Sequence, residues 1–434
     1  DIAWPEALGT LKHIQLGDQS IPASALTVDT PGKTGLSLKA DNAPSFTGRT
    51  ELRVTFASSL PSPPLQSDYE VSAGFGEGCE VSLIPGYPDN SNDFYYSAVS
   101  GAQSLHQHGV RGAGITVAVL DSGLWDHPAL TKDTQGKDRV LARYDAIADT
   151  TTNVFDESGH GSHLTSVMAH SGPTLVKGKE SPGYKGIAPD ANIVAIKAFN
   201  EGGQGGMLDI VRGIQWAMDN RERYDIRVLN LSFSARPRWP YYLDPIKQAV
   251  MRAWAGGITV IAAAGNAGPE PMTVGSPGNL PYIITVGAVT VSWTVDTRAD
   301  DYVPDFSSRG PTPDAHINPD SVAPGGHITG ITRPGSGLLQ DHPEYQLPSG
   351  ELVMTGTSQA AALVSGLVAL LLQLEPDLTP DDVKCKLLGT AEPAINKDGL
   401  LAYTPFQQGH GYVSITRAIT LGERGCGNTD LNIM

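Results

Sequence analysis

The sequence predicts an α/β protein in which a parallel β-sheet is covered by helices on both faces. From about residue 94 onward, short continuous apolar runs alternate with amphipathic helical patterns. The runs lack the polar alternation of a half-exposed strand, and the helices between them supply the crossover connections that parallel strands need. The strands predicted in this way cover residues 115–120, 193–198, 226–233, 258–263 and 282–286.

The helices between these runs have recognisable boundaries. Segment 207–218 repeats apolar residues at helical spacing, with charged residues on the opposite face. A second helix is expected from Asp244, which can cap it and is followed by proline, to a Gly-Gly pair at 256–257. A third begins at Thr379 by the same logic. In such folds, ligands bind at the carboxyl ends of the strands.

Residues 1–92 are predicted to form a small β-rich N-terminal domain, followed by a larger domain over residues 93–434. Around residues 51–56, apolar and polar side chains alternate with the period of a half-buried strand. Clear helical patterns are missing from this part of the sequence. Similar short alternations occur at 36–39, 69–73 and 79–83.

Composition limits the classes of function. The formal net charge is −16, from 46 acidic and 30 basic residues, and 40% of the residues are hydrophobic. This composition indicates a globular protein and argues against a nucleic-acid partner, because no basic surface is evident. The longest apolar run, around 360–373, is shorter than the roughly 20 residues that a bilayer span needs. We therefore expect a monomer without a membrane span.

The three cysteines leave two arrangements open. Cys79, Cys385 and Cys426 allow one disulfide and one free thiol, or no disulfide at all. Their spacing does not suggest a metal site. The cysteines therefore indicate the redox compartment only weakly.

Two polar residues stand where chemistry is plausible. Asp121 comes at the end of the first apolar run, and a carboxylate there is costly unless it is hydrogen-bonded or paired. The ordinary alternative is an Asx turn at a strand end. His160 lies between two glycines and is followed by the apolar pattern of a helix. For this residue the alternative is a capping or surface histidine, and the nearby His163 is expected to pack on the helix.

A hydroxyl residue at the start of a long apolar helix raises a further question. Ser358, like the Thr before it, could simply cap that helix. A serine hydroxyl is a poor nucleophile unless a neutral imidazole accepts its proton, and the imidazole needs a carboxylate to orient it. Asp121, His160 and Ser358 would supply these parts, and the positive end of a helix favours developing negative charge.

Acyl transfer also needs a donor for the oxyanion that forms on the attacked carbonyl. Asn266 follows the apolar run at 258–263 and is flanked by Gly265 and an alanine. By itself, an asparagine between small residues is an ordinary turn. The interpretation as an oxyanion donor depends on the other three residues.

Four segments together resemble the subtilisin-like serine peptidases. They are VAVLDSG around Asp121, GHGSHLTSVMA around His160, AAAGNAGP around Asn266 and GTSQAAALVSG around Ser358. Each motif alone is weak, but their number and order make coincidence very improbable. Further segments extend the resemblance over roughly residues 94 to 420.

The resemblance implies a subtilisin-like parallel sheet and a role for each residue. Asp121 would orient the imidazole, His160 would act as general base and then general acid, and Ser358 would attack the peptide carbonyl. Asn266 and the backbone N–H of Ser358 would hold the oxyanion. The substrate would lie as an extended strand between two backbone segments. The residues implied in substrate binding are Gly202, Gly203, Gly205, Leu231, Ser232, Phe233, Ser234, Ala264, Gly265 and Gly275.

The resemblance also suggests a specificity. The primary pocket would be lined by residues 262–265 and floored near Gly275, all small and uncharged. We expect a preference for apolar or aromatic residues before the scissile bond. Ser234 stands where the family typically has glycine, which would narrow the entrance of the pocket.

No cofactor is required for this chemistry. Many relatives bind structural calcium in a loop that corresponds here to residues 171–186. This loop carries lysines and few carboxylates, whereas calcium takes six or more oxygen ligands. We predict no metal ligands there, and a structural calcium elsewhere among the acidic residues stays unlocated.

The predicted function is therefore a serine endopeptidase of broad specificity that acts on polypeptides. A catalytically silent binding protein on the same fold is one alternative, although no residue of the implied site is missing. The other is a peptide-joining transamidase, for which no water-excluding lid is evident in the sequence.

Two expectations concern biology rather than chemistry. Residues 1–92 resemble the inhibitory segment of the family poorly, so a retained accessory domain is the first interpretation and a pro-segment the second. We expect a secreted protein, because a broad endopeptidase endangers its own cytosol, and a cytoplasmic protein is the alternative.

Overall fold

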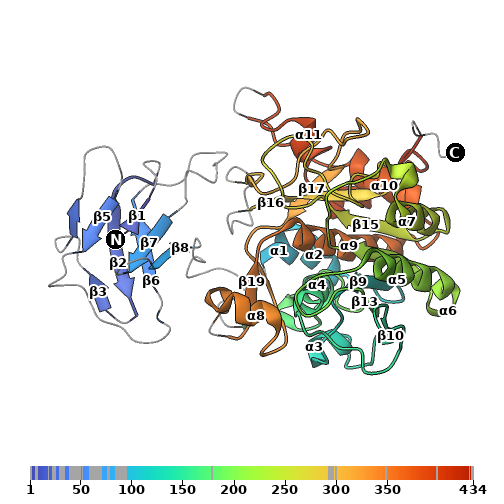
Figure 1. Ribbon diagram of the computed structural model, residues 1–434, viewed down its shortest axis with the longest axis horizontal. Helices are drawn as coiled ribbons and strands as arrows, with labels where there is room; N and C mark the ends of the chain where they lie inside the picture. The colour runs from blue at the N-terminus through green and yellow to red at the C-terminus, as the bar shows by residue number, and fades with distance from the viewer. Residues whose placement is uncertain are drawn as a thin grey trace. The chain divides into compact units, whose positions relative to one another are not determined.

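The computed structural model describes most of the chain from residue 95 onward and separate stretches before it (Figure 1). The chain divides into two units, residues 1–90 with 292–302, and residues 91–291 with 303–434. The described residues are 2–4, 8–17, 19–21, 26–28, 35–38, 50, 52–57, 71–75, 79–83, 95–176, 179–291, 298, 301–347, 349–396, 399–429 and 431.

The first unit consists of antiparallel strands (Figure 1). One sheet has the order β4-β5-β1-β7-β8 and the other the order β3-β2-β6. Ile14 is fully buried and packs in a cluster with Trp4, Val71 and Ala73. The β-rich character predicted for this region is therefore present. The strands are β1 (Ile2–Ala3), β2 (Leu11–Leu16), β3 (Gln19–Ile21), β4 (Leu26–Val28), β5 (Gly35–Leu38), β6 (Leu52–Phe56), β7 (Val71–Phe75) and β8 (Cys79–Leu83).

The second unit is built on a seven-stranded parallel sheet with the order β10-β13-β9-β14-β15-β16-β17 (Figure 1). All residues of β9, β15 and β16 are buried, as their continuous apolar sequences predict. The strands are β9 (Thr116–Asp121), β10 (Val140–Asp145), β13 (Asn192–Lys197), β14 (Ile226–Leu231), β15 (Thr259–Ala263), β16 (Ile284–Val289) and β17 (Ser321–Pro324).

Helices cover both faces of this sheet. Ser365 of α9 (Thr357–Leu374) donates a hydrogen bond to Asn230, which is paired in register with Val119 on the next strand. Gly213 of α5 (Met207–Asp219) lies instead against Leu120. Because successive residues of a strand point to opposite faces, α9 and α5 cover opposite faces. Helix α4 (His160–Ala169) packs on α9, and α7 (Pro245–Ala255) packs on α5.

The remaining elements are short, apart from α10. They are α1 (Tyr95–Val99), α2 (Ala102–Gln107), α3 (Pro128–Thr131), α6 (Arg221–Tyr224), α8 (Gly337–Asp341), α10 (Pro380–Gly389), α11 (Pro405–Gln408), α12 (Ile415–Ala418), the 3₁₀ turns η5 (Tyr241–Leu243) and η6 (Pro343–Tyr345), and the antiparallel pairs β11 (Pro173–Val176) with β12 (Lys179–Tyr184) and β18 (Ile328–Gly330) with β19 (Leu352–Met354).

The long apolar run forms the central helix α9. By length and composition this helix is the one candidate for a membrane span among the described residues, but 83% of its apolar window is buried inside the protein. Its contacts with five strands of the sheet and with α4 identify it as a core helix.

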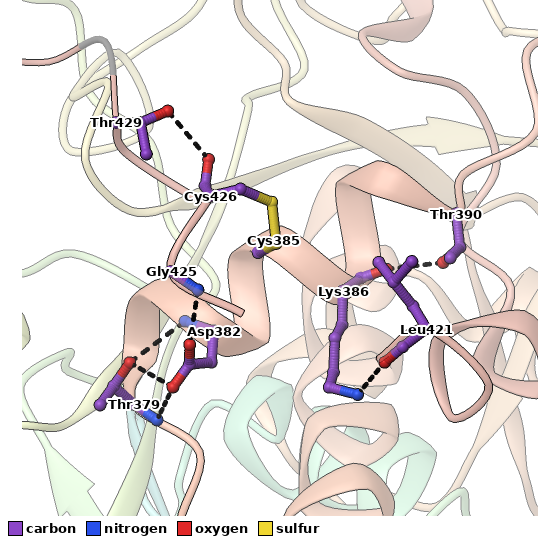
Figure 2. Close-up of a disulfide and its surroundings, with 9 residues drawn as sticks. All are labelled: Thr379, Asp382, Cys385, Lys386, Thr390, Leu421, Gly425, Cys426 and Thr429. Atoms are coloured by element: carbon purple, nitrogen blue, oxygen red, sulfur yellow. Dashed lines mark hydrogen bonds between the residues drawn. A yellow bond between two sulfur atoms is a disulfide. The ribbon is translucent and has the colours of Figure 1, made fainter. Parts of the chain in front are cut away.

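A disulfide ties the C-terminal segment to α10 (Figure 2). Cys385 of α10 is bonded to Cys426. Of the two arrangements that the sequence left open, the one with a disulfide is therefore present. Thr379 and Asp382 form a reciprocal capping box at the start of α10. Asp382 also accepts a hydrogen bond of 2.7 Å from the backbone N–H of Gly425, beside the disulfide. The side chain of Cys79 lies outside the described part of the chain.

We predict that replacing Cys385 and Cys426 by serine lowers thermal stability. The bond closes a loop with a sequence separation of 41 residues. A loop of that size contributes up to about 3–4 kcal/mol through the entropy of the unfolded chain, and its loss corresponds to a Tm decrease on the order of 5 °C in a unit of this length. Calorimetry on the double variant measures the shift, and an unchanged Tm would contradict the prediction.

Candidate active site

The site begins at the carboxyl end of β9. Asp121, its last residue, is 2% exposed and accepts three hydrogen bonds on Oδ1. The backbone N–H and the hydroxyl of Ser122 donate two of them, at 2.8 and 3.2 Å. His160 provides the third, from Nδ1 at 2.8 Å. The carboxylate is therefore compensated at a buried position where it would otherwise be costly.

A second buried carboxylate fixes the position of His160 at the start of α4. Asp156 is fully buried, and its Oδ1 accepts a hydrogen bond of 2.7 Å from the backbone N–H of Gly159. Its Oδ2 accepts from the backbone N–H and the hydroxyl of Ser162, at 2.8 and 2.7 Å. Asp156 was not among the residues that the sequence motifs indicated. An acidic residue shortly before a helix is the signal that could have found it, since such residues satisfy the free N–H groups of the first turn.

The pKa of His160 is raised above its ordinary value of 6.5. Burial alone would lower this pKa, because it disfavours the imidazolium. The charge of Asp121, its hydrogen bond and the charge of Asp156 act in the opposite direction and outweigh burial. The two carboxylates thus stabilise the protonated form of His160, the form that a general base adopts after it accepts a proton.

Ser358 is the second residue of α9 and lies beside Ser232. Its hydroxyl donates a hydrogen bond of 2.9 Å to the Ser232 carbonyl, and the Ser232 hydroxyl donates one of 3.0 Å to the Ser358 carbonyl. Ser232 follows the end of β14, the strand paired with β9, and lines the same cavity as Asp121 and His160. Within the described residues, the Ser358 hydroxyl has no hydrogen bond to His160. The structure thus pairs the carboxylate with the imidazole and leaves the hydroxyl on a neighbouring carbonyl.

Asn266 lies against the residue before Ser358. Its Oδ1 accepts hydrogen bonds of 3.0 Å from both the backbone N–H and the hydroxyl of Thr357. The oxygen end of the amide is therefore occupied. Asn266 is exposed, and among the described residues its Nδ2 has no hydrogen-bond partner. The amide keeps a donor available beside the start of α9.

Thr357 is fully buried and serves as a junction in this arrangement. Besides its two bonds to Asn266, its hydroxyl accepts a hydrogen bond of 3.1 Å from the backbone N–H of Gly265. The sequence alone offered only a helix-capping role for a hydroxyl here. The partner, some ninety residues away in sequence, becomes visible only in the fold.

The predicted substrate-binding residues fall into two groups and two outliers. A cavity of about 290 Å³ beside His160 is lined by Gly202, Gly203, Ser232, Phe233 and Ser234, among others. Two predicted residues belong to neither group. Leu231 is fully buried in the sheet, and Gly205 lies against the ring of Phe199.

The second group surrounds the hydroxyl of Ser234. A Cβ placed on Gly275 would lie 1.9 Å from this oxygen, and one placed on Gly265 would lie 2.6 Å from it. The φ of Gly265 is +109°, which side chains rarely adopt. Ala264 is buried, and its carbonyl accepts a hydrogen bond of 3.0 Å from the N–H of Gly275. Ser234 therefore occupies the space between the two glycines.

His163 lies in the core. It is buried, and its Nε2 is 3.0 Å from the Leu352 carbonyl. Burial lowers its pKa to about 4, so the ring stays neutral. No group of three or more His, Cys, Asp or Glu side chains in the described ranges could hold a metal ion. Within the loop considered for calcium, residues 173–176 and 179–184 form the strands β11 and β12.

The comparison with known proteins identifies relatives for this second unit. A model of the subtilase family matches residues 112–411. Serine protease AprX of Bacillus subtilis (strain 168) is 38% identical over 278 residues, which are 63% of this chain and 60% of AprX. Subtilisin E of the same strain is 32% identical over 67% of this chain and 64% of its own length. The chain thus spans less than two thirds of both relatives.

Solved structures agree with the family match. The S41 psychrophilic protease superposes with a TM-score of 0.56 at 28% identity, covering 70% of this chain and 92% of that protein. Sphericase gives a TM-score of 0.55 at 26% identity, with the same coverage. The predicted subtilisin-like parallel sheet with helices on both faces is confirmed. Together with the matched family model, these likenesses show that this chain belongs to the subtilase family.

Proposed function

We propose that this protein is a serine endopeptidase that hydrolyses polypeptides through an acyl-enzyme on Ser358. The observation that carries the proposal is the 2.8 Å bond between buried Asp121 and His160 Nδ1, beside the cavity that Ser232 also lines. This bond leaves His160 Nε2 as the nitrogen that can accept a proton. Family membership supports the reaction class.

The first half-reaction forms the acyl-enzyme. The Ser358 hydroxyl leaves the Ser232 carbonyl by rotation about χ1 and turns to His160 Nε2. Its oxygen attacks the peptide carbonyl carbon while Nε2 takes the proton, which gives a tetrahedral oxyanion. The carbon–nitrogen bond then breaks as Nε2 returns the proton to the leaving amine. Asp121 remains ionised and stabilises the imidazolium throughout.

The second half-reaction repeats these steps with water. Water attacks the acyl carbon while Nε2 accepts one of its protons, and the bond to Ser358 Oγ breaks as the proton returns to the serine. In both halves the oxyanion would be held by Asn266 Nδ2 and by the backbone N–H of Ser358 in the first turn of α9. No metal or cofactor takes part in these steps.

We further propose a preference for apolar residues of moderate size immediately before the scissile bond. The primary pocket would be bounded by Ala264, Gly265 and Gly275, which carry no charge. The Ser234 hydroxyl between the two glycines supports a limit on size, because it occupies volume that a large ring would need.

We also propose that the protein is secreted. The Cys385–Cys426 disulfide supports it, because such bonds persist mainly in oxidising compartments.

Ser358→Ala provides the direct test of the reaction. We expect casein cleavage to fall by about 10⁶-fold, the loss known for subtilisin itself, and labelling by a fluorophosphonate to disappear. The wild-type protein should cleave casein equally well with and without a chelator, since the chemistry uses protein groups alone. Unchanged cleavage by the variant would sink the proposal. Wild-type labelling without hydrolysis, or with peptide joining, would favour the binding or transamidase alternatives.

Asp121→Asn tests the role of the buried carboxylate. In the wild type, kcat/KM should fall as the pH drops through the raised pKa of His160, so its acid limb lies above pH 6.5. The variant loses the charge and the hydrogen bond that raise this pKa, so the limb should move to lower pH. Its rate should also fall about 10⁴-fold, as in subtilisin. A limb that stays in place would show that Asp121 does not set this pKa.

Ser234→Gly tests the size limit of the primary pocket. Removing the hydroxyl opens the space between Gly265 and Gly275. We expect the ratio of kcat/KM for phenylalanine over alanine before the scissile bond to rise about tenfold, within the range for added apolar contact in a pocket. Ser104→Gly is the matched control, because Ser104 is exposed on α2 and lies outside the site. Ser122→Gly would be unsuitable as a control, because the Ser122 hydroxyl donates a hydrogen bond to Asp121. A ratio unchanged from the wild type would contradict the assignment.

A further inference from the structure

The cavity beside His160 has a wall that the sequence motifs did not predict. Besides the predicted substrate-binding residues, its lining includes Leu338 and Asp341, both from α8. This helix lies in the segment between β18 and β19, far in sequence from the other lining residues. The segment between β18 and β19 therefore forms one side of the cavity.

Helix α8 is fixed to the loop that precedes His160. The backbone N–H groups of Gly337 and Leu338 donate hydrogen bonds to the carbonyls of Glu157 and Ser158, at 3.0 and 2.9 Å. The hydroxyl of Thr332 donates one of 3.0 Å to the Gly159 carbonyl. These carbonyls come directly before His160, so the hydrogen bonds fix the position of α8 relative to the imidazole.

The lining combines an apolar interior with an acidic rim. The rings of Phe199 and Phe233 are in contact, with centroids 5.1 Å apart, and Leu338 is half-buried. Glu201 and Asp341 are both exposed, and within the described residues neither has an ion-pair partner. No lysine or arginine is among the lining residues.

We propose that this cavity is a specificity subsite for a lysine or arginine side chain of the polypeptide substrate, at a position other than the one in the primary pocket. Such a side chain has an aliphatic stem that packs on apolar surface and a cationic tip that stays near water. The stem would lie on Phe199, Phe233 and Leu338, and the tip would lie between Glu201 and Asp341. This inference rests on the proposed peptidase function.

The electrostatics set the size of the effect. Exposed ion pairs contribute about 0.2–1 kcal/mol, so each carboxylate should change kcat/KM for a lysine-containing substrate by about 1.4-fold to fivefold. A glutamate at the same substrate position is repelled by both carboxylates. We therefore expect a lysine-over-glutamate ratio on the order of tenfold or more at low salt, decreasing as salt screens the charges.

The experiment uses the full chain and peptides with one fixed apolar residue before the scissile bond. The second, third and fourth residues before that bond are replaced in turn by lysine, norleucine or glutamate, and kcat/KM is measured at low and high salt. Norleucine matches the aliphatic stem of lysine without its charge. Glu201→Gln and Asp341→Asn are compared with Glu222→Gln, an exposed carboxylate on α6 outside the cavity.

We expect lysine to be preferred at one of these positions in the wild type and in Glu222→Gln. Each cavity variant should reduce the preference severalfold, and the double variant should abolish it while norleucine peptides are cleaved as before. A wild type that cleaves all peptides without a lysine preference, or a preference that survives in the double variant, would overturn the subsite. Failure to cleave any peptide and to label at Ser358 would instead overturn the proposed peptidase function.

Discussion

The hydrogen bond between Asp121 and His160 is the interaction on which the rest of the site depends. It joins the last residue of a buried strand to the first residue of a helix packed on that strand's face. A carboxylate at this depth is tolerated because Ser122 and His160 satisfy it. The same bond orients the imidazole and raises its pKa against the effect of burial. The same hydrogen bond therefore both compensates the burial of the Asp121 carboxylate and prepares the imidazole for proton transfer.

The parallel sheet makes this contact possible. Adjacent parallel strands end at the same edge of the sheet. Asp121 at the end of β9 and Ser232 just after β14 therefore line the same cavity, although more than a hundred residues separate them in sequence. Helix α9 brings Ser358 and Thr357 to that edge from the far end of the chain. Buried polar contacts along its length, such as Ser365 with Asn230, fix its register against the sheet. The site inherits its precision from this core packing.

The sequence predicted what short-range patterns encode. The central strands, α5, α7 and α10 follow from apolar runs, helical spacing and caps, and the family motifs indicated Asp121, His160, Asn266 and Ser358. The edge strands β10 and β17 were missed. The first is partly exposed and carries polar residues, and the second has only four residues and ends in proline. Asp156 was also missed, although an acidic residue shortly before a helix is a local signal. The contact between Thr357 and Gly265 and the wall formed by α8 were out of reach, because no local pattern records which distant segment will be adjacent.

A crystal structure with a peptide aldehyde or boronic acid bound would test the central claim most directly. The account predicts a covalent bond to Ser358 Oγ, with this oxygen released from the Ser232 carbonyl. The oxygen that represents the oxyanion should lie about 2.7–3.1 Å from Asn266 Nδ2, with His160 Nε2 facing the adduct and Nδ1 still bonded to Asp121. An adduct on another residue, or an imidazole separated from both Asp121 and Ser358, would contradict the account.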